Sequence, residues 1–140
     1  MYQIVLDTNV LVAAMRSKRG ASHRLLSLLG DRRWRSNLTV PVVLEYEAVL
    51  KRTCTEFGLT ETDIDDLIDA VCAYSGLQRL YFVWRPTAAD ADDDLIMDAA
   101  IASHSDFIVT FNKRDFPNAQ RFGIRCLTPK EFLILIEEAL

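Results

Sequence analysis

The sequence predicts an α/β sandwich with a mostly parallel sheet. Short apolar runs of strand length alternate with segments whose apolar residues recur at helical spacing, and strands separated by helices form sheets that those helices cover. The 140 residues suffice for a single domain with a sizeable core, expected to span residues 1–140, and are too few for two ordinary domains. Half of the residues are apolar, which excludes a disordered chain.

Five short apolar runs are predicted to be strands. They cover residues 2–6, 37–40, 80–84, 107–110 and 123–127. The first and fourth runs are expected to be buried in the sheet, and the last is expected at an edge. Ligands of open α/β sheets bind beyond the carboxyl ends of the strands, so the residues that follow the strands are the first candidates for a site.

Six segments are predicted to be helices from their apolar spacing or from cap signals. They cover residues 10–15, 21–29, 42–52, 60–74, 92–103 and the residues after Thr128. Gly30 ends the second helix and Pro41 suits the first turn of the third. Gly76 is expected to end the fourth. Thr60 resembles an N-terminal cap, and Thr128 with Glu131 matches a capping box.

The net charge of −4 argues against a nucleic-acid partner, since most domains that bind nucleic acid carry a basic excess. The distribution of charge weakens that objection. Acids concentrate in two later segments, residues 61–69 and 90–98, whereas bases crowd the first quarter of the chain. These bases are Arg16, Lys18, Arg19, Arg24, Arg32, Arg33 and Arg35. If metal neutralises the second acidic segment, a basic side remains that could hold a phosphate backbone.

The sequence gives no sign of membrane insertion or secretion. No apolar run approaches the roughly 20 residues of a membrane span, and the N-terminus lacks the pattern of a secretory signal, so a soluble cytoplasmic protein is expected. Cys54, Cys72 and Cys126 lie far apart and form no metal-binding spacing with either histidine. They are expected to be free thiols in a reducing compartment.

Carboxylates recur where predicted strands give way to helices. Asp7 follows the first strand directly, Asp115 follows the fourth at short distance, and Glu45 and Asp94 lie near the starts of two helices. We expect these four acids to converge in one pocket. Clustered acids repel one another unless a hard cation lies among them, and divalent cations promote phosphodiester hydrolysis. The acids therefore point to metal-assisted cleavage of a phosphodiester.

Four blocks of sequence carry a family resemblance. They are residues 6–12, 44–50, 90–100 and 109–116, and together they span nearly the whole chain. In this order the blocks resemble a PIN domain, the metal-dependent nuclease fold of many bacterial toxin–antitoxin toxins. The resemblance implies a three-layer α/β/α fold, Mg²⁺ or Mn²⁺ as cofactor and RNA as substrate. It further implies a toxin with endoribonuclease activity and a cognate antitoxin that blocks the site.

The first two acids also have structural explanations. Asp7 could simply cap the helix that follows it, and the match to the family's first acid favours metal ligation. Thr8 and Asn9 would then orient its carboxylate, or would be ordinary helix-start residues. Glu45 and Glu47 both lie near the edges of the apolar stripe of their helix, so periodicity does not separate them. Only the family's Glu-Tyr pairing selects Glu45.

Five acids compete in the third block. An EF-hand is the first alternative, because Asp90, Asp92 and Asp94 occupy the first, third and fifth positions of its loop. The alternative fails twice. Leu95 stands where the loop needs glycine, and Ile101 stands where it needs a bidentate glutamate.

The resemblance selects Asp94 among these acids. In the family, the third acid opens a helix and precedes a strand-end threonine by a fixed interval, which Asp94 and Thr110 satisfy. Asp98 lies one turn later on the same helical face and could assist through a water or as a ligand of a second metal. Asp92 and Asp93 are expected to be solvated helix-start acids.

The fourth ligand has two candidates. The family places an acid at the position of Asn112, at that of Asp115, or at both, and here the nearer position holds an amide. Asn112 can coordinate a cation but adds no charge, so one or two bound metals both stay open. Lys113 and Arg114 could contact phosphate or merely flank the loop.

Two other classes of protein fit part of the pattern. A phosphatase of the haloacid dehalogenase type also begins with a strand that ends in aspartate, but it needs a second aspartate where this chain has Asn9. The other alternative is a PIN-like module that binds RNA or protein without catalysis. The apolar face of residues 21–29 is expected to exceed what the sheet covers, which would leave a patch for a homodimer or an antitoxin.

Overall fold

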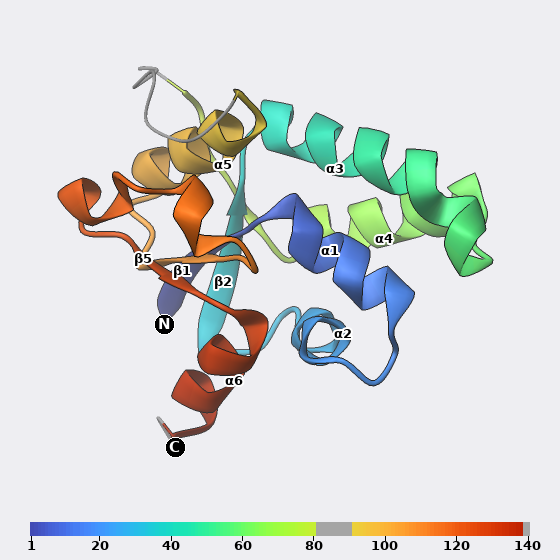
Figure 1. Ribbon diagram of the computed structural model, residues 1–140, viewed down its shortest axis with the longest axis horizontal. Helices are drawn as coiled ribbons and strands as arrows, with labels where there is room; N and C mark the ends of the chain where they lie inside the picture. The colour runs from blue at the N-terminus through green and yellow to red at the C-terminus, as the bar shows by residue number, and fades with distance from the viewer. Residues whose placement is uncertain (81–90, 139–140) are drawn as a thin grey trace.

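The computed structural model describes residues 1–80 and 91–138, and within them the chain forms a five-stranded sheet and six α-helices (Figure 1). The strands are β1 (Tyr2–Leu6), β2 (Trp34–Leu38), β3 (Gly76–Leu77), β4 (Phe107–Val109) and β5 (Arg125–Leu127). They lie in the order β3-β2-β1-β4-β5, and every neighbouring pair is parallel. The predicted α/β fold with a parallel sheet is therefore confirmed.

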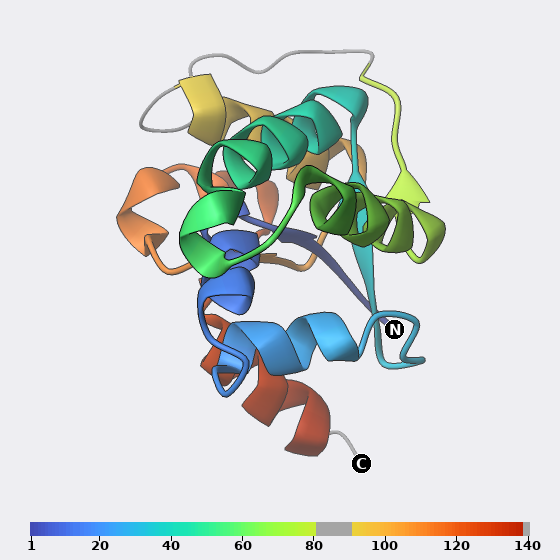
Figure 2. The ribbon, with the colours of Figure 1, turned by 90° about the vertical axis from the view of Figure 1, so that its right-hand side faces the viewer.

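The helices cover the sheet on both faces, which gives the three α/β/α layers. They are α1 (Thr8–Arg16), α2 (Ala21–Ser27), α3 (Val40–Thr53), α4 (Glu61–Ala73), α5 (Ala91–Ala102) and α6 (Pro129–Glu138). Figure 2 shows α3, α4 and α5 on one side of the strands, and α2 with α6 on the other. Short 3-10 turns are η1 (Cys54–Phe57), η2 (Lys113–Asp115) and η3 (Ala119–Phe122). Among the described residues, no helix has the length and apolar character that a membrane crossing requires.

Capping side chains fix the starts of two helices, as the sequence predicted. At α4, the Thr60 hydroxyl accepts a hydrogen bond from the Asp63 N–H at 3.2 Å, and the Asp63 carboxylate accepts one from the Thr60 N–H at 2.8 Å. Thr128 and Glu131 form the same reciprocal pair at α6, with distances of 3.1 and 2.9 Å. Each pair satisfies two backbone donors that the helix itself leaves unpaired.

Several element boundaries differ from the prediction. β2 begins at Trp34, three residues earlier than expected, because the buried Trp34 pairs with Tyr2 of β1. The prediction that Gly76 ends α4 is wrong, since α4 ends at Ala73 and Gly76 begins β3. A Cβ atom at Gly76 would lie 2.7 Å from Asn37 Oδ1 and 2.9 Å from a guanidinium nitrogen of Arg35, so any larger residue would displace these two side chains of β2. The strand expected over 80–84 extends into residues 81–90, which lie outside the described residues.

An aromatic cluster closes the sheet at the amino ends of its central strands. Tyr2, Trp34 and Phe107 are the first residues of β1, β2 and β4, and all three meet Phe132 of α6 edge to face. The ring centroids lie 6.3, 5.9 and 5.9 Å from that of Phe132. Edge-to-face packing adds to the free energy of burying such large side chains.

The leucines of α2 face the interior. Leu25 and Leu26 are buried in the core, Leu28 and Leu29 are half-buried, and α2 packs against α1 and α6. The apolar face of this helix is therefore covered mainly by other helices of the same chain, and the expected homodimer or antitoxin contact stays a prediction. The periodicity correctly indicated an apolar face but did not indicate what lies against it.

Candidate active site

β1 and β4 lie side by side, but the sheet grows in opposite directions from them. β2 continues the sheet beyond β1, and β5 continues it beyond β4. Such a reversal of strand order opens a crevice at the carboxyl ends of the two strands. Asp7 follows β1 and Thr110 follows β4 at this crevice, and the Asp7 N–H donates to the Val109 carbonyl at 2.9 Å. The strand pairing thus brings two residues together that lie 103 positions apart.

Asp7 occupies the N-cap position of α1, but its side chain makes no capping hydrogen bond. Instead, its Oδ2 accepts a hydrogen bond from the Thr110 hydroxyl at 2.7 Å. The same hydroxyl oxygen accepts one from the backbone N–H of Asn112 at 3.0 Å. Asp7 is only 7% exposed and Thr110 is fully buried. A capping role therefore does not explain Asp7, and Thr110 positions its carboxylate together with the loop of Asn112.

Tyr46 of α3 supports the end of β1 from the other side. Its hydroxyl donates a hydrogen bond to the carbonyl of Leu6, the residue before Asp7. Burial, assisted by the nearby Asp7 carboxylate, raises the pKa of Tyr46, so the hydroxyl stays protonated and keeps donating. The helix that carries Glu45 is in this way tied to the strand that carries Asp7.

A cavity of about 630 Å³ opens beside Asp7, between α1 and α3. Side chains from four segments of the chain line it. They are Thr8, Asn9, Val12, Ala13, Arg16, Glu45, Val49, Arg52, Asp92, Phe111 and Asn112. The predicted residues Thr8, Asn9, Glu45 and Asn112 therefore share one cavity, next to the Asp7–Thr110 pair.

The structure separates the two glutamates that periodicity left equivalent. Glu45 lines the cavity, whereas Glu47 forms an ion pair with Lys51 at 3.3 Å. Lys51 also pairs with Asp65 of α4 at 2.8 Å, so Glu47 belongs to a surface network between α3 and α4. Only Glu45 is placed for chemistry in the cavity.

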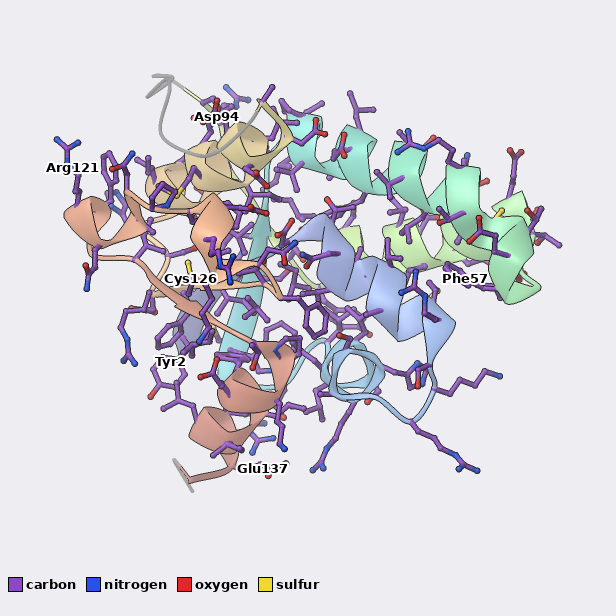
Figure 3. The ribbon with its side chains drawn as sticks, viewed as in Figure 1. Tyr2, Phe57, Asp94, Arg121, Cys126 and Glu137 are labelled. Atoms are coloured by element: carbon purple, nitrogen blue, oxygen red, sulfur yellow. The ribbon has the colours of Figure 1, made fainter. Side chains whose placement is uncertain are left out.

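The acids of α5 have different surroundings. Asp92 is exposed and lines the cavity. Asp94 and Asp98 are buried, and the expectation of a solvated Asp93 is wrong because this side chain is only 8% exposed. Figure 3 shows Asp94 on the first turn of α5, near the start of α3. Successive residues of a helix point about 100° apart, so consecutive aspartates necessarily meet different neighbours.

Only one of the two candidate ligands in the loop after β4 reaches the cavity of Glu45. Asn112 lines the cavity with Glu45, whereas Asp115 lies in η2 and lines a neighbouring pocket of about 640 Å³. Phe111 and Asn112 contribute to both pockets, while Lys113 and Arg114 line only the second of the two. Of the two candidates, Asn112 is the one that the structure brings to Glu45.

Lys113 anchors this loop to α6. Its Nζ lies 2.6 Å from a carboxylate oxygen of Glu131, the residue that completes the α6 capping box. The hydrogen bond from Lys113, and next the one from the backbone of Thr128, lower the pKa of Glu131 to about 2. Lys113 is therefore engaged by an acid of the same chain.

The donor chemistry of the cavity fits a hard divalent cation. Within residues 1–80 and 91–138, no three acid, histidine or cysteine side chains form a preformed metal-binding group. The cavity nevertheless offers oxygen donors from several segments, and Asn9 Oδ1 is buried without a hydrogen-bond donor among the described residues. Mg²⁺ keeps several waters and binds through one or two carboxylates plus substrate phosphate, so it does not require a closed cage of acids.

Some lining residues were not predicted. Arg16 was recognised only as one of the bases of the first quarter, and Asp92 was assigned to solvent. Arg52 was not singled out, because which side of α3 meets α1 depends on tertiary packing. The spacing from Glu45 to Arg52, two helical turns, could have placed both on one face of the helix.

Comparison with known families agrees with this geometry. A search of curated proteins finds no match. A family model described as PIN domain matches residues 3–114, a segment that runs from β1 to the start of η2 and includes Asp7, Glu45, Asp94 and Asn112. The match covers well over half of the chain, so this protein belongs to the PIN domain family.

Proposed function

We propose that this protein is a metal-dependent endoribonuclease that acts as the toxin of a toxin–antitoxin pair. PIN domains are generally nucleases, and the cavity beside β1 supports that chemistry with oxygen donors from separate segments. One observation carries the proposal. Asp7 stands where a helix cap would stand, yet its carboxylate accepts a hydrogen bond from Thr110, and the residues that follow the pair in sequence, Thr8 and Phe111, line the cavity.

The residues proposed to hold Mg²⁺ or Mn²⁺ are Asp7, Glu45 and Asp94, with Asn112 or Asp115 as the fourth ligand. When bound, such a cation activates water for attack on phosphorus and stabilises the charge on the leaving oxygen. Thr110 keeps the Asp7 carboxylate in place. Thr8 and Asn9 begin α1 at the same cavity and would orient ligands or water, and Asp98 would assist from the second turn of α5.

Cleavage assays test the enzymatic part of the proposal. Purified protein should cleave RNA with Mg²⁺ or Mn²⁺, and Asp7→Asn should lower the rate by about 10²–10³-fold, the scale of losing one group that stabilises transition-state charge. The fold should survive, because an asparagine oxygen can still accept the Thr110 hydrogen bond. Unchanged cleavage in excess EDTA would rule out the metal mechanism.

Two glutamates of α3 supply a matched control. Glu45→Gln should reduce cleavage strongly because Glu45 lines the cavity, whereas Glu47→Gln should leave it unchanged because Glu47 pairs with Lys51 outside it. RNA binding without metal-dependent cleavage would instead support the alternative of a non-catalytic PIN-like module. The amide at Asn112, where the family often has an acid, is the feature that favours that alternative.

Expression in bacteria tests the toxin role. The wild-type protein should arrest growth, Asp7→Asn should not, and co-expression of a cognate antitoxin should restore growth. An antitoxin and a homodimer are both part of the proposal, and co-purification with light scattering would detect them. If cells that express the active nuclease grow normally, the protein is not a toxin, but the proposed nuclease activity still stands.

A further inference from the structure

The cavity between α1 and α3 has a second end, and that end is basic. Arg16 is the last residue of α1 and Arg52 lies near the end of α3, and both line the same cavity as Glu45. Arg16 lies eight residues after Thr8, and Arg52 lies seven after Glu45, or about 12 and 10 Å along the helix axes at 1.5 Å per residue.

The two helices that form this groove run side by side. α1 packs against α3, and both run in the same direction away from the carboxyl ends of β1 and β2 (Figure 1). Val12 and Val49 lie between the two charged ends and give the groove an apolar middle. An acidic end, an apolar middle and a basic end thus follow one another along the groove. The distance between the two charged ends is longer than one nucleotide of an extended strand.

Neither arginine is neutralised by an acid of residues 1–80 or 91–138. Other bases do form such pairs, for example Arg24 with Glu137 and Lys51 with Asp65. The Arg16 guanidinium lies over the ring of Phe57, 5.7 Å from its centroid. This cation–π contact positions the guanidinium and leaves its charge available.

Phe111 provides a different contact at the acidic end. Its side chain is 49% exposed although it is large and apolar, and it lines both the groove and the pocket of Asp115. An exposed aromatic ring beside a charged groove is the usual platform on which unpaired bases stack.

We propose that this groove binds a single-stranded nucleic acid across the active site, with Arg16 and Arg52 holding a backbone phosphate beyond the scissile one and Phe111 stacking a base. The position of the scissile phosphate at the acidic end rests on the proposed function. The net charge of −4 makes the chain as a whole repel a polyanion, so attraction must be local, and these two arginines supply it.

Binding assays without turnover test the groove. The probe is a fluorescein-labelled, nuclease-resistant 2′-O-methyl RNA single strand, and its affinity is measured by anisotropy over a range of salt concentrations. Arg16→Gln with Arg52→Gln should weaken binding about tenfold or more at low salt. It should also reduce the slope of log affinity against log salt by about 0.7–1.4, for one or two lost phosphate contacts on a single strand.

Arg121→Gln is the matched control, because Arg121 is exposed and Figure 3 shows it across the molecule from Phe57. This control should keep the parental affinity and slope. Arg52→Gln alone is the decisive single variant, since Arg16→Gln also removes the Phe57 contact. Phe111→Leu should weaken binding about fivefold or more without changing the slope, because stacking releases no counterions.

The outcomes separate this proposal from the nuclease itself. If the double variant keeps the parental affinity and salt dependence, the groove does not bind RNA as proposed, even if the protein cleaves RNA. If the salt dependence of binding depends on the two arginines but the protein never cleaves RNA, the binding role of the groove is supported and the proposed nuclease activity is wrong. A duplex probe should not depend on Phe111, because its bases are already stacked, and equal dependence would overturn the role of that ring.

Discussion

The two ends of the central strands have opposite chemistry. At the amino ends, the half-buried Tyr2 and the buried Trp34 and Phe107 meet Phe132 in an aromatic cluster. At the carboxyl ends, Asp7 is buried and hydrogen-bonded to a fully buried threonine beside an open cavity. A parallel sheet gathers all of its strand starts at one edge and all of its strand ends at the other. The five residues of β1 therefore separate a stabilising aromatic contact at its start from a candidate catalytic residue just after its end.

Because the two ends differ in this way, substitutions at each end should have different consequences. At the amino end they should lower the free energy of unfolding and leave turnover of the folded protein intact. At the carboxyl end they should lower turnover and cost less stability, since acids gathered beside a cavity contribute little to a packed core.

Phe132→Ala tests the amino end and has the largest expected effect. Removing this fully buried ring should lower the free energy of unfolding by about 3–5 kcal/mol, the usual cost of a phenylalanine-sized cavity. Urea titration measures the loss, and cleavage per folded molecule should stay at the wild-type value. If the alanine variant does not fold, Phe132→Leu should show a smaller loss in the free energy of unfolding and again unchanged cleavage per folded molecule. A fall in turnover of the folded protein would show that the two ends are not independent.

The acids of α5 test the carboxyl end next. The family pattern selects Asp94, whereas the cavity contains Asp92. If Asp94 is the ligand, Asp94→Asn should lower Mn²⁺ affinity and turnover by about a hundredfold or more, on the scale of losing one charge-stabilising group. Asp92→Asn should have a much smaller effect, and Asp98→Asn should fall between them. Turnover and Mn²⁺ titrations on the three variants give the order, and the reverse order would assign the ligand to Asp92.

Local sequence signals predicted the helices, the strands β1, β2, β4 and β5 and the strand-end residues, but not β3 at Gly76–Leu77. An apolar run that stops at Asp7, and a capping pair such as Thr60 with Asp63, depend only on neighbouring residues, so both could be recognised without a structure. The early start of β2 could not, because Trp34 owes its place to Tyr2 and Phe132, which are distant in sequence.

The same reasoning explains what was missed in the site. Glu45 and Glu47 are equivalent by periodicity. The spacing of Glu47 and Lys51 along α3 allows an ion pair, but the contact of Lys51 with Asp65 of α4, which places Glu47 in a network outside the cavity, depends on helix packing. The sharing of one cavity by Glu45 and Arg52 likewise depends on how α1 packs against α3. Residues whose role depends on a partner helix are thus the ones that sequence patterns leave undecided.

Thr110→Val separates positioning from ligation at the carboxyl end. The substitution keeps the shape of the side chain and removes the hydroxyl that bonds both Asp7 and the Asn112 backbone. Metal affinity or turnover should fall by about 10–100-fold, as when a group that orients a metal ligand is lost. Thr128→Val is the matched control, because it removes only the α6 cap and should cost about 1 kcal/mol of stability without affecting cleavage. Equal losses of activity in both variants would argue against a positioning role for Thr110.

The ion pair between Lys113 and Glu131 gives the smallest expected effect, because both side chains are 46% exposed. The folded-state pKa of Glu131 is lowered from 4.5 to about 2, so the stability that its carboxylate contributes is present above pH 4.5 and is lost as the pH falls toward 2. Glu131→Gln removes the charge and keeps an oxygen for the Thr128 N–H. At neutral pH, the free energy of unfolding of the wild type should exceed that of this variant by no more than about 0.5–1 kcal/mol, because solvent screens an exposed ion pair. Urea titrations at pH about 7 and about 3 should show the difference shrinking with acid. A difference independent of pH would mean that the charge does not hold the Asn112 loop to α6.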